Sequence, residues 1–231
     1  MTTSIQSLTV EVWSDFACPW CWIAKHRFEM ALANFKHRDQ IKVNHRAYRL
    51  AIGQRPMPIK AVLLKKFGNH RSVDDFVNSI QTHAEATGLV YNFDTLLFGD
   101  TTAVHALVKA ADRLDVSQAL IENLYEASIT RGVSLYDLDS IAVEAAKLDI
   151  PKEFVKNAWT NSELIRLITK DESTAKSFGS GVPLFQLAKS CTISGAQSVE
   201  VFTQSLEQMY SSATSSLSYQ GMTCDLSGCE G

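Results

Sequence analysis

Apolar and polar residues alternate in two short segments near the start of the chain, residues 8–13 and 41–47. An alternation with period two predicts β-strands with one buried face. Between them, residues 18–35 carry apolar side chains at helical spacing. Pro19 stands at the beginning of that segment, where a helix tolerates the missing N–H group of proline. The first part of the chain is therefore predicted to run strand, helix, strand.

A long helical block is predicted to follow. Residues 51–59 contain a glycine and two prolines, which mark a loop. From about residue 60 to 178, apolar residues recur at intervals of three and four, as in helices with one buried side. Gly179 is a typical helix stop, so the last of these helices is expected to end at Phe178. The segment is long enough to form a subdomain of its own.

The strand pattern returns after this block. Residues 182–187 and 191–194 predict two strands, and residues 199–209 predict a closing helix. Residues 211–218 are rich in Ser and Thr and are expected to be flexible. We therefore predict an α/β protein in which one domain is interrupted by a helical insertion. The predicted boundaries are 1–55 and 176–212 for the discontinuous domain, 56–175 for the inserted helical subdomain and 213–231 for a flexible C-terminal tail.

The composition is that of an ordinary globular protein and excludes several function classes. Of 231 residues, 45% are hydrophobic and 20% are charged, which argues against disorder. The formal net charge is −3 and no block of Lys and Arg stands out, so nucleic acid and anionic membranes are poor candidate partners. No apolar run reaches about 18 residues, and Met1–Ser7 lack the features of a signal peptide. We therefore expect a cytoplasmic protein without a membrane span.

The candidate chemistry lies in Cys18-Pro19-Trp20-Cys21, a C-x-x-C motif at the start of the first predicted helix. There, unpaired backbone N–H groups and the helix dipole favour negative charge, and so favour the thiolate that attacks disulfides. Cys21 lies one helical turn further on, close enough to attack a mixed disulfide on Cys18. We predict that Cys18 is the exposed nucleophile and Cys21 the buried resolving thiol. Pro19 and Trp20 are expected to bias the redox potential.

A C-x-x-C motif can also be half of a zinc site. The obvious other half is Cys224 and Cys229, and four thiolates would complete a tetrahedral structural site. The strand–turn–helix context of Cys18 and Cys21 favours redox chemistry over zinc binding. The six histidines show no metal-ligand spacing, so no metal site is predicted.

A second element with chemical meaning is Gly181-Val182-Pro183 at the start of an apolar strand. A proline there removes one donor from the strand ladder. If the bond between Val182 and Pro183 is cis, the Val182 backbone is pressed against the C-x-x-C motif. Its free backbone groups then pair with an extended substrate strand. The alternative is a trans proline after a glycine turn.

Four segments resemble the DsbA family. Asp15–Lys25 (DFACPWCWIAK) resembles the family's active-site segment and is most similar to its FrnE-like branch. Gly181–Phe185 resembles the family's cis-proline loop, and Ile193–Gln197 its Ser-Gly-Ala-Gln segment. Thr101–His105 resembles a helix start in the family. The similarity covers roughly residues 8 to 210.

The resemblance implies a thioredoxin-like fold with an inserted helical domain, thiol–disulfide exchange by Cys18 and Cys21, and a cis Pro183. It also makes His105 a candidate neighbour of the active site, although a core or helix-start histidine is the simpler interpretation. Residues 45–50 (HRAYRL) depart from the family's Trp-Arg-Pro-Phe-x-Leu. The substrate is therefore expected to differ more than the chemistry.

The remaining cysteines are interpreted separately. Cys224 and Cys229 resemble a second C-x4-C motif of some FrnE-like proteins, which implies an auxiliary dithiol that exchanges with Cys18 and Cys21. The alternative is a terminal tail with two ordinary thiols. Cys191 lies in a predicted strand and is expected to be a small core residue.

We therefore predict a protein disulfide oxidoreductase or isomerase that acts on protein or small-molecule disulfides. No cofactor is predicted besides its own redox-active disulfide, with glutathione as the candidate cofactor. Its electron partner would be of the thioredoxin or glutathione type. One alternative is a glutathione-dependent transferase or isomerase of the kappa or 2-hydroxychromene-2-carboxylate isomerase type. Such enzymes resemble this chain in architecture but carry serine where Cys18 stands. The other alternative is a zinc-stabilised binding module. The motif does not decide the direction of the redox reaction.

Overall fold

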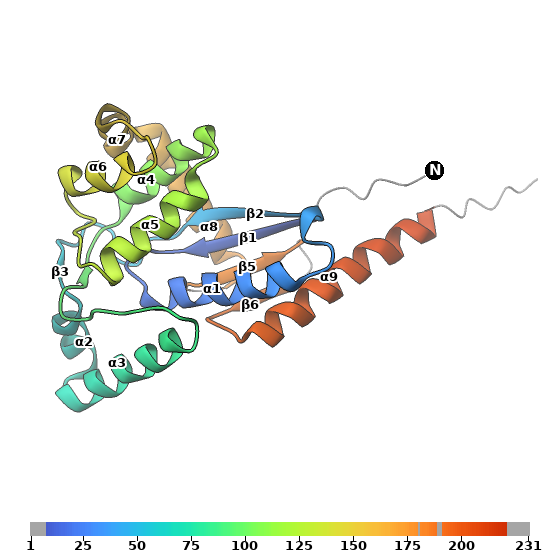
Figure 1. Cartoon of the computed structure of the whole chain (residues 1–231), viewed down its shortest axis with the longest axis horizontal. Coiled ribbons are helices and arrows are strands. Elements are labelled where there is room, and N and C mark those ends of the chain that lie inside the picture. Colours follow the sequence, from blue (N-terminus) through green and yellow to red (C-terminus); the bar gives the residue numbers. More distant parts are fainter. Residues whose placement is uncertain (1–7, 180, 189–190, 221–231) are drawn as a thin grey trace, which may run out of the picture.

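The computed structural model (Figure 1) contains a four-stranded sheet with the strand order β2-β1-β5-β6. β1 (Leu8–Ser14) lies parallel to β2 (Ile41–Ala47) and antiparallel to β5 (Leu184–Leu187). β6 (Cys191–Ser194) completes the sheet by antiparallel pairing with β5. The structure describes all residues except 1–7, 180, 189–190 and 221–231.

One face of the sheet is covered by α1 (Pro19–Asn34) and α9 (Val199–Gln220), which lie side by side (Figure 1). Three aromatic rings join these elements, because Phe28 of α1 and Phe202 of α9 both contact Phe185 of β5. The ring centroids are 5.4 Å and 4.8 Å from that of Phe185. The alternation seen in the sequence thus places apolar side chains of the strands beneath these two helices.

The segment between β2 and β5 is mainly helical, as predicted. Its helices are α2 (Ile59–Phe67), α3 (His70–Glu85), α4 (Thr102–Ala111), α5 (Ser117–Ile129), α6 (Leu138–Ala146), α7 (Lys152–Trp159) and α8 (Ser162–Lys176). Short 3-10 turns follow α1 at Arg38–Gln40 and α4 at Asp112–Leu114. Side chains of Asn69, Asp137 and Asn161 cap α3, α6 and α8, which fixes where these helices begin.

Helix α8 connects this block to the sheet and lies against β2. Asp171 of α8 is the main link. Its backbone carbonyl accepts a hydrogen bond of 2.9 Å from the indole of Trp13 in β1. Its carboxylate accepts the N–H of Ala47 at 3.0 Å and contacts Lys109. The helical block is therefore fixed to the C-terminal ends of β1 and β2, and the cysteine motif follows β1 in the chain.

The structure differs from the sequence predictions at several boundaries. A two-stranded sheet of β3 (Met57–Pro58) and β4 (Leu97–Phe98) was not predicted. Strand β5 begins at Leu184 instead of Val182, and α8 ends at Lys176 instead of Phe178.

The expectation of a flexible tail from residue 213 is wrong for residues 213–220, which continue α9. Within the helix, Ser and Thr hydroxyl groups bond to backbone carbonyls one turn back, as Thr214 does to Tyr210 at 3.0 Å. Tyr210 in turn stacks on His37, with ring centroids 3.9 Å apart.

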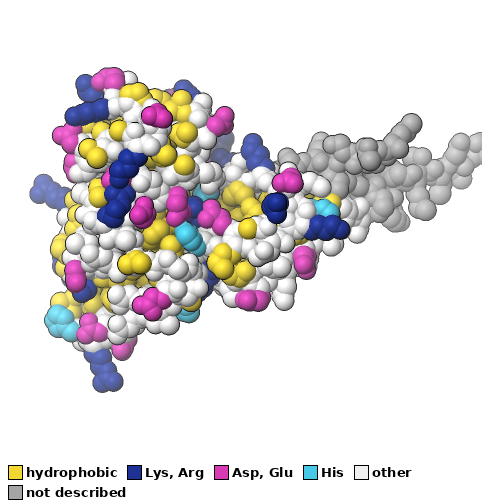
Figure 2. Space-filling view, in the orientation of Figure 1, with side chains coloured by type: hydrophobic (Ala, Val, Ile, Leu, Met, Phe, Trp, Pro, Cys, Tyr) yellow, Lys and Arg dark blue, Asp and Glu magenta, His cyan; other side chains and the backbone are white. Residues whose placement is uncertain are grey.

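Acidic and basic side chains alternate over the face shown in Figure 2, without a large patch of one sign. Within the part of the chain that the structure describes, none of the helices combines the length and apolar character needed to cross a bilayer.

Candidate active site

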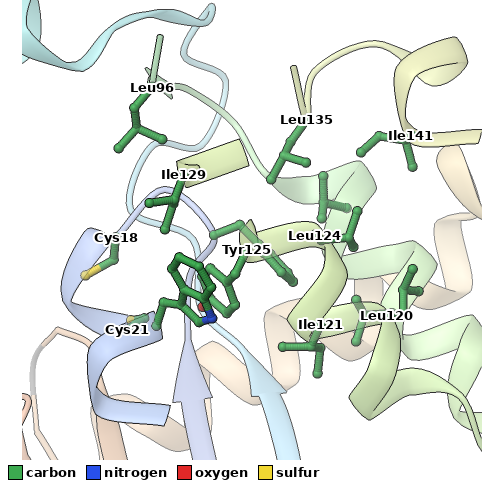
Figure 3. Close-up of a cluster of buried hydrophobic side chains, with 14 of the residues drawn as sticks. Cys18, Cys21, Leu96, Leu120, Ile121, Leu124, Tyr125, Ile129, Leu135 and Ile141 are labelled. Carbon is green, nitrogen blue, oxygen red and sulfur yellow. The ribbon is translucent and has the colours of Figure 1, made fainter. Parts of the chain in front are cut away.

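The two cysteines of the C-x-x-C motif lie on the first turn of α1. Cys18 is the N-cap residue and Pro19 is the first helical residue, as predicted. The turn before the helix closes through a hydrogen bond of 3.1 Å from the N–H of Cys18 to the carbonyl of Asp15. The N–H of Cys21 donates to the carbonyl of Cys18 at 3.1 Å. In Figure 3, Cys18 points away from the buried helices, and Cys21 lies nearer to Tyr125.

The proline loop before β5 lies against this turn. The bond between Val182 and Pro183 is cis, and Gly181 before it has a positive φ of 93°. The thiol of Cys18 donates a hydrogen bond to the Val182 carbonyl, with the two atoms 3.8 Å apart. The structure thus brings together two segments that are 164 residues apart in the sequence.

Both motif cysteines are buried, with 6% of Cys18 and 2% of Cys21 exposed. The prediction of an exposed Cys18 is therefore wrong, because Val182 of the proline loop covers its sulfur. Burial raises the pKa of the Cys21 thiol well above its ordinary value, and the neighbouring Cys18 raises it further. Cys21 therefore keeps its proton as long as nothing activates it.

Asp15 holds the turn that precedes the motif. Its fully buried carboxylate accepts the N–H of Ala17 at 3.1 Å, the hydroxyl of Thr101 at 2.6 Å and the N–H of Leu50 at 2.6 Å. These three bonds join the motif turn to the start of α4 and to the loop after β2. The carboxylate is therefore occupied as a turn-stabilising group.

Three aromatic side chains support the motif from behind. Trp22 of α1 stacks on Tyr125 of α5 with ring planes 11° apart. Its ring also contacts that of Tyr91, with centroids 5.6 Å apart. The hydroxyl of Tyr125 donates to the carbonyl of Asp15 at 3.2 Å. The hydroxyl of Tyr91 donates to the carbonyl of Pro19 at 2.7 Å. Both tyrosines belong to the helical block.

A charged cluster adjoins these rings. Glu122 of α5 accepts hydrogen bonds from Trp22 at 3.0 Å and Lys25 at 2.5 Å, and it lies 2.8 Å from the ring nitrogen of His26. Lys25 also donates to Glu29 at 3.0 Å. His26, Glu29 and Glu122 carry side chains that commonly bind metal ions, and their ligand atoms lie within 4.8 Å of one another. The ammonium of Lys25 already binds both carboxylates, so the cluster is balanced by its own cation.

Glu122 gives a pH-dependent prediction. Burial alone would raise the pKa of its carboxyl, but hydrogen bonds from His26 and Lys25 outweigh burial and lower the pKa from 4.5 to about 2. The carboxylate therefore stabilises the fold above about pH 4.5, and this contribution is lost as the pH falls towards 2. Because the side chain is 38% exposed, solvent screening limits the effect to about 1 kcal/mol.

We expect Glu122→Gln to lower the free energy of unfolding by that amount at pH 7 and by much less near pH 2.5. Urea unfolding at several pH values measures this difference. Glu163→Gln is the matched control, because the Glu163–Arg166 pair lies at the surface. An effect of Glu122→Gln that is equal at all pH values would contradict the assignment.

His105 lies beside the motif turn and not at the sulfur atoms of the motif. Its ring nitrogen Nε2 is 3.5 Å from the Asp15 carboxylate, and its ring centroid is 5.2 Å from that of Phe16. The side chain is buried on α4. The contacts fit the simpler interpretation of a core histidine that packs behind Asp15.

Trp20, the other residue between the cysteines, is only partly buried. Its ring centroid lies 5.3 Å from that of His83 on α3. Arg27 of α1 donates to the ring nitrogen of His83 at 3.1 Å and to the carbonyl of Ala196 at 2.7 Å. The segment that resembles the family's Ser-Gly-Ala-Gln stretch is thereby joined to the motif helix and to the helical block.

His45 marks the departure from the family's pattern and faces a different part of the molecule. It lines a cavity of about 430 Å³ between α1 and β2, together with Lys25 and Gln118. Burial and the charge of Lys25 lower the pKa of His45 to about 4. The lining of this cavity does not include the motif cysteines.

The other cysteines do not join the site. Cys191 is a free thiol in β6, partly buried against the apolar layer under α9. Cys224 and Cys229 lie outside the described residues.

Comparison with known proteins identifies the fold family. A family model for the DSBA-like thioredoxin domain matches residues 9–207. The chain is similar to a probable DsbA oxidoreductase from Streptomyces coelicolor, with 32% identity and a TM-score of 0.84 over 88% of this chain and 90% of that one. Among curated proteins, none matches the sequence.

Two more distant structures share the fold. The cytosolic disulfide reductase DsbM from Pseudomonas aeruginosa, with GSH, has 17% identity and a TM-score of 0.65 over 88% of this chain and 99% of that one. A 2-hydroxychromene-2-carboxylate isomerase has 14% identity and a TM-score of 0.59 over 95% of this chain and 100% of that one. The predicted thioredoxin-like fold is thus confirmed, while the FrnE-like branch stays a prediction. With 199 consecutive residues matched (9 to 207 inclusive), the chain belongs to the DSBA-like thioredoxin domain family, whose oxidoreductase character it shares.

Proposed function

We propose that Cys18 and Cys21 are the redox-active pair of this oxidoreductase and that the Val182–Pro183 loop receives the substrate. The observation that carries the proposal is the position of the Cys18 thiol. It lies at the N-terminus of α1, 3.8 Å from the Val182 carbonyl, with Cys21 one turn behind it. A helix N-terminus stabilises a thiolate, and a nearby second thiol can resolve a mixed disulfide.

The proposed reaction has two exchange steps. The Cys18 thiolate attacks a substrate disulfide, forms a new S–S bond and releases the first substrate sulfur as a thiolate that takes up a proton. Cys21 then loses its proton and attacks the Cys18 sulfur, which releases the second substrate sulfur. The substrate is reduced by two electrons and the protein is oxidised to the Cys18–Cys21 disulfide. The reverse sequence oxidises a dithiol substrate.

The proposed substrates are protein or small-molecule disulfides and dithiols. An extended peptide strand is favoured, because the Val182 backbone beside the Cys18 sulfur offers hydrogen-bonding groups to such a strand. A thioredoxin- or glutathione-type partner would exchange electrons with the pair in the cytoplasm. The likeness to a cytosolic disulfide reductase supports this setting. An auxiliary role of Cys224 and Cys229 stays a prediction.

A glutathione-dependent isomerase or transferase is the second candidate. It is favoured by the shared fold with 2-hydroxychromene-2-carboxylate isomerase and with a DsbM structure that contains GSH. The second thiol at Cys21 is not needed for such chemistry, which is why the redox proposal ranks first.

The test is the reduction of insulin disulfides by dithiothreitol with and without the protein. We expect the protein to accelerate the appearance of insulin aggregates over dithiothreitol alone. No acceleration, together with turnover of glutathione conjugates, would replace the redox proposal by the second candidate.

A further inference from the structure

We propose that Tyr91 is a positioning residue for the second exchange step: its hydroxyl holds the peptide between the two cysteines so that Cys21 reaches the Cys18 sulfur. The proposal rests on the proposed redox function and deepens it. It also gives the helical block a part in the chemistry, because Tyr91 lies between α3 and β4 of that block.

The central contact is a buried hydrogen bond. The Tyr91 hydroxyl donates to the Pro19 carbonyl at 2.7 Å, across 72 residues of sequence. That carbonyl belongs to the peptide group that joins Pro19 to Trp20, midway between Cys18 and Cys21. The orientation of this one peptide group helps to set how the two sulfur atoms face each other.

The aromatic stack keeps the Tyr91 hydroxyl in place. Its ring lies between Trp22 and Phe93, with centroid distances of 5.6 Å and 5.9 Å. Tyr125, stacked on the other side of Trp22, bonds the carbonyl of Asp15 at 3.2 Å. Figure 3 shows Tyr125 reaching from α5 towards the turn that carries the cysteines. Two hydroxyls of the helical block thus fix the motif, one before Cys18 and one between the cysteines.

The hydroxyl stays a donor throughout the reaction. Burial raises the pKa of Tyr91 far above that of a free phenol, and negative charge on Cys18 or Cys21 raises it further. Formation of a thiolate in the motif therefore favours the protonated Tyr91 hydroxyl, which keeps its hydrogen bond to the Pro19 carbonyl.

The two exchange steps depend on this bond to different degrees. Attack of Cys18 on an external disulfide needs only the Cys18 sulfur and the substrate. Resolution needs the Cys21 thiolate aligned with the new bond between Cys18 and the substrate sulfur, so it depends on the Pro19 peptide group. Loss of the Tyr91 hydroxyl leaves a buried carbonyl without this partner, and the first turn of α1 is then free to shift.

Tyr91→Phe tests the inference, with oxidised glutathione as the probe. The reduced protein is mixed with the probe, stopped with acid at successive times and analysed by mass spectrometry. Wild type is expected to form a short-lived glutathione adduct on Cys18 and then the internal disulfide, releasing two glutathione thiols. In Tyr91→Phe we expect adduct formation at the wild-type rate and resolution slowed about 10-fold.

Tyr136→Phe is the matched control. Tyr136 also belongs to the helical block, and its hydroxyl also donates to a backbone carbonyl, that of Leu97 at 3.3 Å, which is not part of the motif turn. It is expected to resolve the adduct like wild type. Equal adduct lifetimes in wild type and Tyr91→Phe would overturn the inference, as would equal slowing by both substitutions. If wild type forms neither adduct nor internal disulfide, the proposed function itself fails.

A thermal unfolding curve shows whether the Tyr91→Phe protein is folded. If it is unfolded at the assay temperature, both proteins are assayed below the midpoint of the variant's unfolding curve, and equal adduct lifetimes there overturn the inference.

Discussion

Cys18→Ser is expected to remove disulfide exchange altogether. The protein-dependent part of the insulin reduction rate should fall at least about 100-fold, which leaves the rate of dithiothreitol alone. The reason is that a serine hydroxyl does not form the nucleophilic anion that a thiol forms at neutral pH. The fold should persist, since serine is close to cysteine in size and Cys18 contributes one weak sulfur hydrogen bond. Insulin turbidity and thermal unfolding together measure both expectations.

The matched control for this prediction is Cys191→Ser. Among the described residues, Cys191 is the free cysteine outside the C-x-x-C motif, and it lies in β6. This variant should keep the wild-type rate. If it loses activity while Cys18→Ser keeps it, the nucleophile has been assigned to the wrong cysteine.

Cys21→Ser is expected to stop the reaction after its first step. Cys18 still attacks the substrate, but no second thiol on α1 can release it, so the mixed disulfide accumulates to nearly one equivalent. The intermediate should be long-lived, because its release then depends on attack by an external thiol instead of the neighbouring Cys21. Acid-stopped mixtures with oxidised glutathione, analysed by mass spectrometry, measure the trapped fraction.

The contrary result for Cys21→Ser would be full turnover without a trapped adduct. Cys18 alone would then be sufficient, as in the glutathione-dependent alternative. The Cys18→Ser/Cys21→Ser double variant controls for reaction at other thiols and should form no adduct.

Much of the fold follows from local patterns in the sequence. The alternation over residues 8–13 and 41–47 correctly indicates strands that bury one face under α1 and α9. Pro19 correctly indicates where α1 begins, because a proline fits the first helical position without loss of a hydrogen bond. The contact of Cys18 with Val182 followed from the resemblance to a family, since the two residues are far apart in the sequence.

The rest of the site depends on contacts that have no local signal. Tyr91 bonds to Pro19, 72 residues away in the sequence, and Glu122 bonds to Trp22, 100 residues away. The sequence around Tyr91 and Glu122 is that of an ordinary loop and an ordinary helix. The burial of Cys18 also arises from a distant segment, the Val182 loop. The sequence predicts which sulfur atoms react, while the groups that contact the motif from distant segments became visible only in three dimensions.

The most direct test of the account is to map the disulfide that forms when the protein is oxidised. The reduced protein is treated with oxidised glutathione, remaining thiols are alkylated in acid, and the digested peptides are analysed by mass spectrometry. The account predicts a Cys18–Cys21 disulfide as the main product, with Cys191 alkylated. Oxidised protein in which Cys18 and Cys21 are both alkylated would contradict it.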